Sequence, residues 1–158
     1  MALVAWAGNP PVTLHQDYIM NITEDSIIIS TLVPESERLD FLPRHFGRQM
    51  MAVEQHLFTR LAALSPDYTG GLWHMYDLSN GGCYLAPTDP AEFRMSVHGN
   101  DFDGTVSADA AGIIVMLFTL SELAFRTPHV EVLSERFHQL RDFAAEHADA
   151  RVVFRAID

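Results

Sequence analysis

The sequence has 158 residues, of which 48% are apolar and 20% charged. This composition excludes a chain that is disordered throughout, because such a chain lacks the apolar area that offsets chain entropy, and the length suits one compact domain. The formal net charge is −11, and all 10 cations are arginines because the chain contains no lysine. We therefore expect no direct binding to nucleic acid, no binding to an anionic membrane surface, and no chemistry that needs a lysine.

The sequence also indicates in which cellular compartment the protein is found. Its apolar runs, such as residues 1–7 and Ile113 to Phe118, fall far short of the roughly 18 apolar residues of a membrane span. Residues 1–7 are apolar but have no basic residue ahead of them and are followed by two prolines, so they do not resemble a signal peptide. The single cysteine, Cys83, cannot form an internal disulfide, which fits a reducing compartment. We expect a cytoplasmic protein.

The first 66 residues predict a lead-in, a short strand and two helices. We expect residues 1–25 to be a loosely ordered lead-in, extended at 18–22, and residues 26–158 to form one domain. The β-branched run 27–29 predicts a strand. Pro34 opens a short helix that Pro43 should stop. After Gly47, a second helix should run until Pro66, because apolar residues recur at steps of three and four at Met50, Val53, Leu57, Leu61 and Leu64.

The middle of the chain predicts strands. Residues 72–78 and 92–98 suit strands, and the second alternates apolar with polar side chains, which indicates one solvated face. Ser79-Asn80-Gly81-Gly82 predicts a hairpin with a type I′ turn. Residues 100–104 predict another turn. Together these segments indicate a small antiparallel sheet of about three strands.

The last third returns to helix. Ser107 is a plausible N-cap for a helix over 110–126, which is apolar on nearly every side and should be the central buried element. Thr127-Pro128 should cap and open a further helix, whose apolar stripe is formed by Val130, Leu133, Phe137, Leu140 and Ala144. Residues 151–157 suit either a strand or a buried turn. The predicted class is α+β, a single domain with about three strands and four or so helices.

The residue types raise two chemical hypotheses, metal binding and cysteine-dependent hydrolysis. The eight histidines lack the spacing of a zinc site, and Asp101–Gly104 lacks the further ligands of a calcium loop, so we expect neither metal nor cofactor. A thiol nucleophile needs a base, and the base needs an orienting acid. Cys83, His74 and Asp77 are the residue types for these three roles. Strand alternation places His74 and Asp77 on opposite faces. A small cysteine-dependent hydrolase using Cys83 and a histidine is nevertheless kept as the alternative function.

Four segments, taken together and in order, resemble the ArdB/KlcA antirestriction protein family. They are residues 33–47 (VPESERLDFLPRHFG), 64–73 (LSPDYTGGLW), 78–87 (LSNGGCYLAP) and 104–113 (GTVSADAAGI). The resemblance extends from about residue 28 to 158. It implies a small non-enzymatic α+β protein carried on plasmids, phages and other mobile elements, which protects incoming DNA from host type I restriction-modification enzymes.

The resemblance also implies candidate partner-binding residues. Each has a structural reading beside the functional one. Ser79 and Asn80 fit a turn, Asp109 fits a helix start and Trp73 fits a core aromatic, whereas Arg44 and His45 should lie in a surface loop after Pro43. The candidates are Arg44, His45, Trp73, Tyr76, Ser79, Asn80 and Asp109.

The charge invites the hypothesis of DNA mimicry, which the charge count opposes. One turn of duplex carries roughly 20 phosphates, whereas this chain has 21 carboxylates in total, interleaved with 10 arginines. The densest acidic stretch, residues 89–109, holds five acids and one arginine. We predict inhibition through contact with a protein, either the restriction enzyme or a host factor that it needs. An interaction module with a partner unrelated to restriction is a further possibility that the sequence leaves open, as it does the oligomeric state.

Overall fold

The fold is built around helix α3 (Ala108–Arg126) in a computed structural model, which describes residues 27–158. Ser107 caps this helix as predicted, since its Oγ accepts a hydrogen bond from the Ala110 N–H at 3.0 Å. Ile113, Ile114 and Met116 are fully buried. α3 is long and apolar enough to span a membrane, but 61% of its most apolar window is buried inside the protein. Its composition is that of a core helix.

A three-stranded antiparallel sheet lies against α3, in the order β1 (Ser30–Leu32), β2 (Trp73–Leu78) and β3 (Cys83–Pro87). Every residue of β3 is buried, and β3 packs on the first half of α3. Gly112 permits this close approach, because a Cβ there would lie 2.3 Å from the carbonyl oxygen of Leu85. β1 is an exposed edge strand, and it begins three residues after the start of the strand predicted at 27–29.

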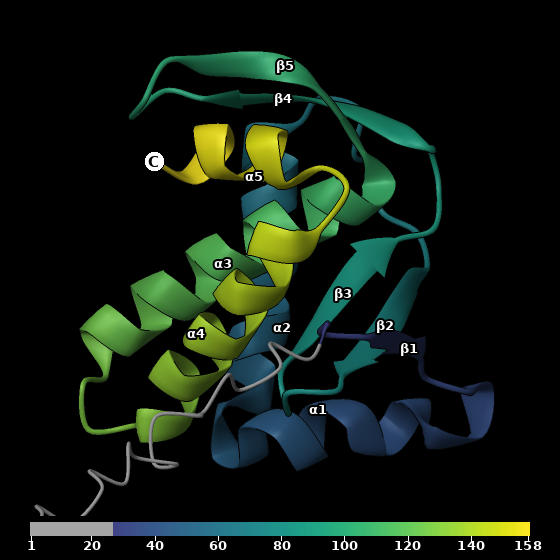
Figure 1. Ribbon diagram of the computed structural model, residues 1–158, viewed down its shortest axis with the longest axis vertical. Helices are drawn as coiled ribbons and strands as arrows, with labels where there is room; N and C mark the ends of the chain where they lie inside the picture. Colours follow the sequence, from purple (N-terminus) through teal and green to yellow (C-terminus); the bar gives the residue numbers. More distant parts are fainter. Residues whose placement is uncertain (1–26) are drawn as a thin grey trace, which may run out of the picture.

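A second sheet is formed by β4 (Glu92–Val97) and β5 (Phe102–Ser107), which arch over α5 at the top of Figure 1. In β4, Phe93 and Met95 are buried while Glu92 and Arg94 are exposed, which confirms the predicted alternation. The strands therefore divide between two small sheets, of three and two strands. The predicted α+β class is confirmed.

The other helices surround α3 and the first sheet (Figure 1). α1 (Arg38–Phe46), flanked by the short helices η2 (Glu35–Glu37) and η3 (Gly47–Gln49), crosses the end of the sheet. α2 (Met50–Leu64) ends before Pro66, as predicted. α4 (Glu131–Glu146) packs along α3, and α5 (Ala150–Ile157) lies beneath the second sheet.

Several local predictions are wrong, each for a physical reason. Pro43 does not stop α1, which continues to Phe46; the carbonyl that loses its hydrogen bond is that of Leu39, whose side chain is 91% exposed, so water can replace the lost donor. In the β2–β3 hairpin, Asn80 does not adopt a positive φ and Gly81 does, at 90°. The turn is therefore not type I′. The positive φ falls on Gly81, the third loop residue after Ser79 and Asn80, as in a three-residue hairpin loop.

Three further boundaries differ from prediction. The turn before β5 lies at 98–101, so residues 102–104 belong to the strand. α4 begins at Glu131, three residues after Pro128, without a side-chain cap. The tail is the helix α5, neither a strand nor a turn, with Val153 and Ala156 buried. The predicted lead-in, including the extended segment 18–22, lies outside the described residues.

Candidate functional site

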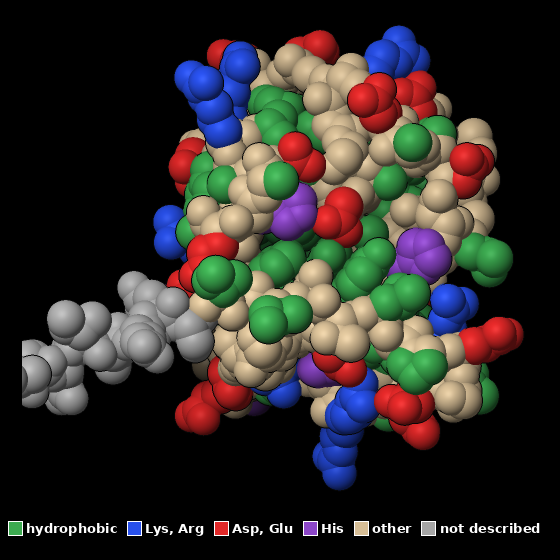
Figure 2. Space-filling view, turned by 45° about the vertical axis from the view of Figure 1, so that its right-hand side comes forward, with side chains coloured by type: hydrophobic (Ala, Val, Ile, Leu, Met, Phe, Trp, Pro, Cys, Tyr) green, Lys and Arg blue, Asp and Glu red, His purple; other side chains and the backbone are tan. Residues whose placement is uncertain are grey.

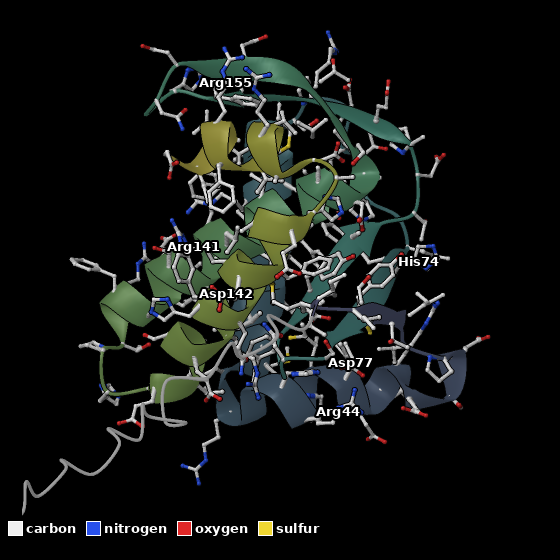
Figure 3. The ribbon with its side chains drawn as sticks, in the orientation of Figure 1. Arg44, His74, Asp77, Arg141, Asp142 and Arg155 are labelled. Carbon is white, nitrogen blue, oxygen red and sulfur yellow. The ribbon has the colours of Figure 1, made fainter. Side chains whose placement is uncertain are left out.

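Asp77 joins α1 to β2 at the base of the sheet. Its Oδ2 accepts a hydrogen bond from Arg44 Nη2 at 2.7 Å, and its Oδ1 accepts one from His45 Nε2 at 2.6 Å. Figure 3 shows Arg44 and Asp77 pointing toward each other between α1 and the end of β2. We call Arg44, His45 and Asp77 the α1–β2 cluster. The prediction that Arg44 and His45 lie in a surface loop is wrong, because both belong to the last turns of α1.

The histidine of this cluster is largely shielded from water. The His45 side chain is only 9% exposed and packs on Phe41, with 4.8 Å between ring centroids. Burial lowers the pKa of His45, against the hydrogen bond with Asp77, and the positive charges of Arg136 and Arg44 lower it further. His45 therefore stays neutral at pH 7 and donates its Nε2 proton to Asp77. Among residues 27–158, its Nδ1 has no hydrogen-bond partner.

Asp109 joins α3, β3 and the loop before α5 on the opposite face of the sheet. Its Oδ1 accepts a hydrogen bond from the Tyr84 hydroxyl at 3.0 Å, and its Oδ2 one from His147 Nε2 at 2.9 Å. We call Tyr84, Asp109 and His147 the α3–β3 cluster. Burial, followed by the charge of Asp109, raises the pKa of Tyr84, so this phenol keeps its proton and donates it to the carboxylate.

The surroundings of His147 extend the α3–β3 cluster. The hydrogen bond with Asp109 raises the pKa of His147, against its partial burial. The Asp149 N–H donates to His147 Nδ1 at 3.0 Å, a bond that is lost when Nδ1 takes up a proton. Ser107 Oγ, which caps α3, in turn donates to Asp149 Oδ2 at 2.7 Å. The start of α3 and the start of α5 are thereby tied to one network.

A hollow of about 550 Å³ opens beside this network. We call it the tyrosine hollow; it is bordered by His74, Tyr76, Tyr84, Thr88, Ser107 and Asp109, among others. Tyr76 stacks on Tyr84, with centroids 4.7 Å apart and ring planes 11° apart. Tyr84 stacks in turn on Phe143 of α4, at 5.5 Å and 25°. Figure 2 shows hydrophobic side chains in a depression of this face, with histidines and acids at its borders.

The remaining candidates have visible structural roles. Trp73 is 7% exposed and packs against Phe58, and its Nε1 donates to the Tyr68 hydroxyl at 3.2 Å. Ser79 Oγ accepts a hydrogen bond from the Ile29 N–H at 2.9 Å, which holds the chain beside β2. Asn80 shapes the hairpin by accepting from the Gly82 N–H, and its amide donates to the Gln139 carbonyl of α4 at 2.8 Å.

Cys83 is not placed as a nucleophile. It lies opposite Asp77 in the sheet and is fully buried, and burial raises the pKa of its thiol far above the ordinary value. His74 pairs with Ala86 further along the strands, and Figure 3 shows it well away from Asp77. The three residues of the hydrolase hypothesis thus do not converge. Over the described part of the chain, no group of three or more His, Cys, Asp or Glu side chains is arranged to hold a metal.

Three members of the clusters, Asp77, Tyr84 and His147, are not among the candidate partner-binding residues, although Asp77 entered the hydrolase hypothesis. Tyr84 lies in the 78–87 segment and directly opposite Tyr76 in the hairpin, so correct pairing of the hairpin would have brought the two rings together. No comparable signal exists for His147, which lies 38 residues from Asp109 in the chain. Its contact depends on how α4 and α5 pack on α3.

Comparisons with known proteins agree with the family resemblance seen in the sequence. Residues 66–158 match the profile of a family described as antirestriction protein. Two proteins from Escherichia coli named antirestriction protein KlcA are 45% and 46% identical to this chain, covering 84% and 86% of it and 95% and 99% of their own length. A solved structure of the KlcA and ArdB proteins is 45% identical with a TM-score of 0.78, and the match covers 88% of this chain and all of that one. The KlcA and ArdB proteins show a novel fold and antirestriction activity against type I DNA restriction systems in vivo but not in vitro.

Proposed function

Since the chain belongs to the antirestriction protein family, we propose that it protects incoming mobile DNA by inhibiting the host's type I restriction-modification enzymes, through contact with a protein. The observation that carries this proposal is the match to KlcA over nearly the whole of both chains, in sequence and in fold. The family profile, which matches residues 66–158, includes Asp77 and the whole α3–β3 cluster.

The charge distribution favours a protein partner over extended DNA mimicry. Figure 2 shows acidic side chains scattered over the face with arginines among them, rather than aligned in a stripe. Several of the acids are also paired with arginine, as in the contacts of Asp67 with Arg94 and of Glu122 with Arg126. A mimic of duplex DNA needs a continuous row of unpaired negative charge, because a duplex presents one charge per about 1.7 Å.

The partner in this proposal is a host factor on which restriction depends, or the restriction enzyme in a state found only in the cell. The activity described for KlcA and ArdB in vivo but not in vitro supports this, since a direct competitor for the enzyme's DNA site would also act on the purified enzyme. Such a role places the protein in the cytoplasm, where restriction enzymes meet incoming DNA.

Three of the candidate residues suit contact with that partner. Arg44, Tyr76 and Asp109 present part of their side chains to solvent, at 45% for Arg44 and 38% for Asp109. His45 and Trp73 are buried and would act by holding their neighbours in place. Ser79 and Asn80 would act in the same way, because their polar atoms are engaged with the backbone.

A non-catalytic role fits this geometry better than the hydrolase alternative. A thiol nucleophile must be accessible and reach its thiolate form near pH 7, and the burial of Cys83 opposes both. We therefore predict that Cys83→Ser preserves protection of phage DNA. Loss of protection in a C83S variant that still folds would revive the hydrolase hypothesis.

The test of the proposed role is a plating assay. Unmodified phage is plated on cells with and without a type I system, each expressing the protein or carrying an empty vector. We expect the protein to restore plaques only in the restricting strain. Equal plating with and without the protein in that strain would overturn the proposal, and an increase in the non-restricting strain would point to an unrelated effect on phage growth.

The mechanism is tested separately with purified components. A labelled DNA fragment bound to a type I enzyme is challenged with increasing amounts of the protein at low and high salt. We expect no displacement. Displacement with a steep salt dependence would show that the protein competes as a DNA mimic.

A further inference from the structure

We propose that the tyrosine hollow is a receptor for an arginine side chain of the protein partner. This inference rests on the proposed function, because it specifies the chemistry by which the partner is recognised. A guanidinium group is planar and cationic, stacks on aromatic rings and forms paired hydrogen bonds with carboxylates. The hollow presents both kinds of surface side by side.

The aromatic surface is rigid. Tyr76 is held from behind by its stack on Tyr84, and Tyr84 by its stack on Phe143. Tyr84 is buried, whereas Tyr76 remains partly exposed at the border of the hollow. A flat group that enters the hollow therefore meets a ring whose orientation is already fixed, so little conformational entropy is lost on binding.

The electrostatics of the hollow favour a cation. Asp109 borders it with a 38% exposed side chain, and among residues 27–158 none that lines the hollow is an arginine. Each oxygen of Asp109 accepts one hydrogen bond from within the protein, and each keeps a second lone pair for an incoming donor. The first turn of α3 would otherwise attract an anion, but Asp109 already places a negative charge there.

Size and hydrogen-bonding capacity agree with the flanking parts of such a ligand. A volume of about 550 Å³ accepts an arginine side chain together with some backbone on either side. Ser30 and Thr88 supply hydroxyl oxygens along the border, and Thr88 Oγ1, which donates to the Leu72 carbonyl, keeps its lone pairs for an incoming donor. The ring of His74 lies beside Tyr76, at 6.2 Å between centroids, and in the described structure its Nδ1 has no hydrogen-bond partner.

Binding is tested with the full chain by recording backbone amide shifts during titration with a blocked tripeptide, acetyl-Gly-Arg-Gly-amide. The matched probe contains citrulline, which has the shape of arginine without its charge, and a third contains lysine. We expect shifts at Tyr76, Asp109 and His74, with affinity for the arginine probe about tenfold above that for the citrulline probe and also above the lysine probe. Equal affinity for the arginine and citrulline probes, or no shift at these residues up to about 50 mM, overturns the proposal.

Two variants define the site. Tyr76→Leu should weaken the arginine probe about fivefold, whereas Phe125→Leu, at a phenylalanine that is 89% exposed on α3, should leave it unchanged. An unfolding curve for each variant shows whether the domain is intact. A probe of the other ligand class, the dinucleotide pTpT, should produce no shift in the hollow; shifts there stronger than those of the arginine tripeptide would assign the hollow to nucleic acid and overturn the proposal.

The plating assay separates failure of this inference from failure of the proposed function. If the wild-type protein protects phage DNA but Y76L protects equally well, the function stands and the arginine receptor is wrong. If the wild-type protein binds the arginine probe in the hollow but gives no protection, the proposed function fails while the site remains. Loss of protection in Y76L, with protection kept in F125L, supports both.

Discussion

The two histidine–aspartate pairs on either side of the first sheet contain the same groups at nearly the same exposure, yet differ in protonation. The side chains of His45 and His147 are 9% and 14% exposed, and those of their partners, Asp77 and Asp109, are 37% and 38% exposed. Nevertheless, the pKa of His45 is lowered and that of His147 is raised.

The difference comes from burial and from the neighbouring charges. His45 is the more deeply buried, and Arg44 and Arg136 oppose a further positive charge there. The hydrogen bond with Asp109 raises the pKa of His147, and the negative charges of Asp109 and Asp149 raise it further. The type of residue pair thus does not determine its behaviour, because the surrounding helices decide whether the histidine is held neutral or encouraged to charge.

The largest effect is expected at Gly112, which lets α3 approach β3. In Gly112→Ala, the added Cβ would meet the carbonyl of Leu85 at 2.3 Å, so α3 must shift. We expect the free energy of unfolding to fall by about 3 kcal/mol, with disruption of the α3–β3 cluster before the α1–β2 cluster. Urea unfolding measures the first effect, and histidine ring NMR signals report on the second.

Gly99→Ala is the matched control, because a Cβ at Gly99 meets nothing within 4 Å. This variant should stay within about 0.5 kcal/mol of wild type. A G112A protein as stable as G99A would contradict the view that close packing of α3 on β3 positions Asp109.

Removal of Asp77 isolates the first pair. Asp77→Ala leaves Nε2 of the buried His45 without its acceptor and frees Arg44, so we expect a loss of about 2 kcal/mol in the free energy of unfolding. The control is Asp142→Ala on α4, an exposed acid labelled in Figure 3, which should change stability by less than about 0.5 kcal/mol. Equal stability of the two variants would show that the α1–β2 cluster contributes nothing to the fold.

Removal of the Tyr84 hydroxyl tests the hydrogen bonds around Asp109 and His147. Tyr84→Phe deletes the donor to Asp109 Oδ1 and should cost about 1 kcal/mol. It also leaves the carboxylate with more negative charge to share with His147, so the pKa of His147 should rise further while that of His45 is unchanged. Histidine titration by NMR checks both values, and a fall in the pKa of His147 would contradict the assigned hydrogen bonds.

The sequence predicted the elements of the fold better than the contacts of the site. Apolar spacing identified α2, an almost wholly apolar segment after the Ser107 cap identified α3, and alternation identified β4, because these signals are local. Arg44 and His45 were assigned to a loop, since the sequence does not show that a proline's missing hydrogen bond falls on a solvated helix face. The Asp109–His147 contact was not predicted, because it links residues brought together only by helix packing.

The smallest expected effect is on the pH dependence of stability, where the two pairs act with opposite sign. An unfolded histidine titrates near 6.5. Because the folded pKa of His45 is lower, the unfolded chain gains a proton first as pH falls, and this group reduces stability below about pH 6.5. Because the folded pKa of His147 is higher, its contribution is fully present below about pH 6.5 and is lost as pH rises through the folded value.

Replacing each histidine by glutamine, which keeps a hydrogen-bond donor, should therefore change the acid response in opposite directions. Between about pH 7.5 and pH 5, His45→Gln should lose less unfolding free energy than wild type, and His147→Gln should lose more. Urea unfolding at both pH values measures the difference, with the exposed His129→Gln as the control that follows wild type. A change of the same sign in H45Q and H147Q would contradict the opposite directions in which burial and the neighbouring charges shift the pKa values of the two rings.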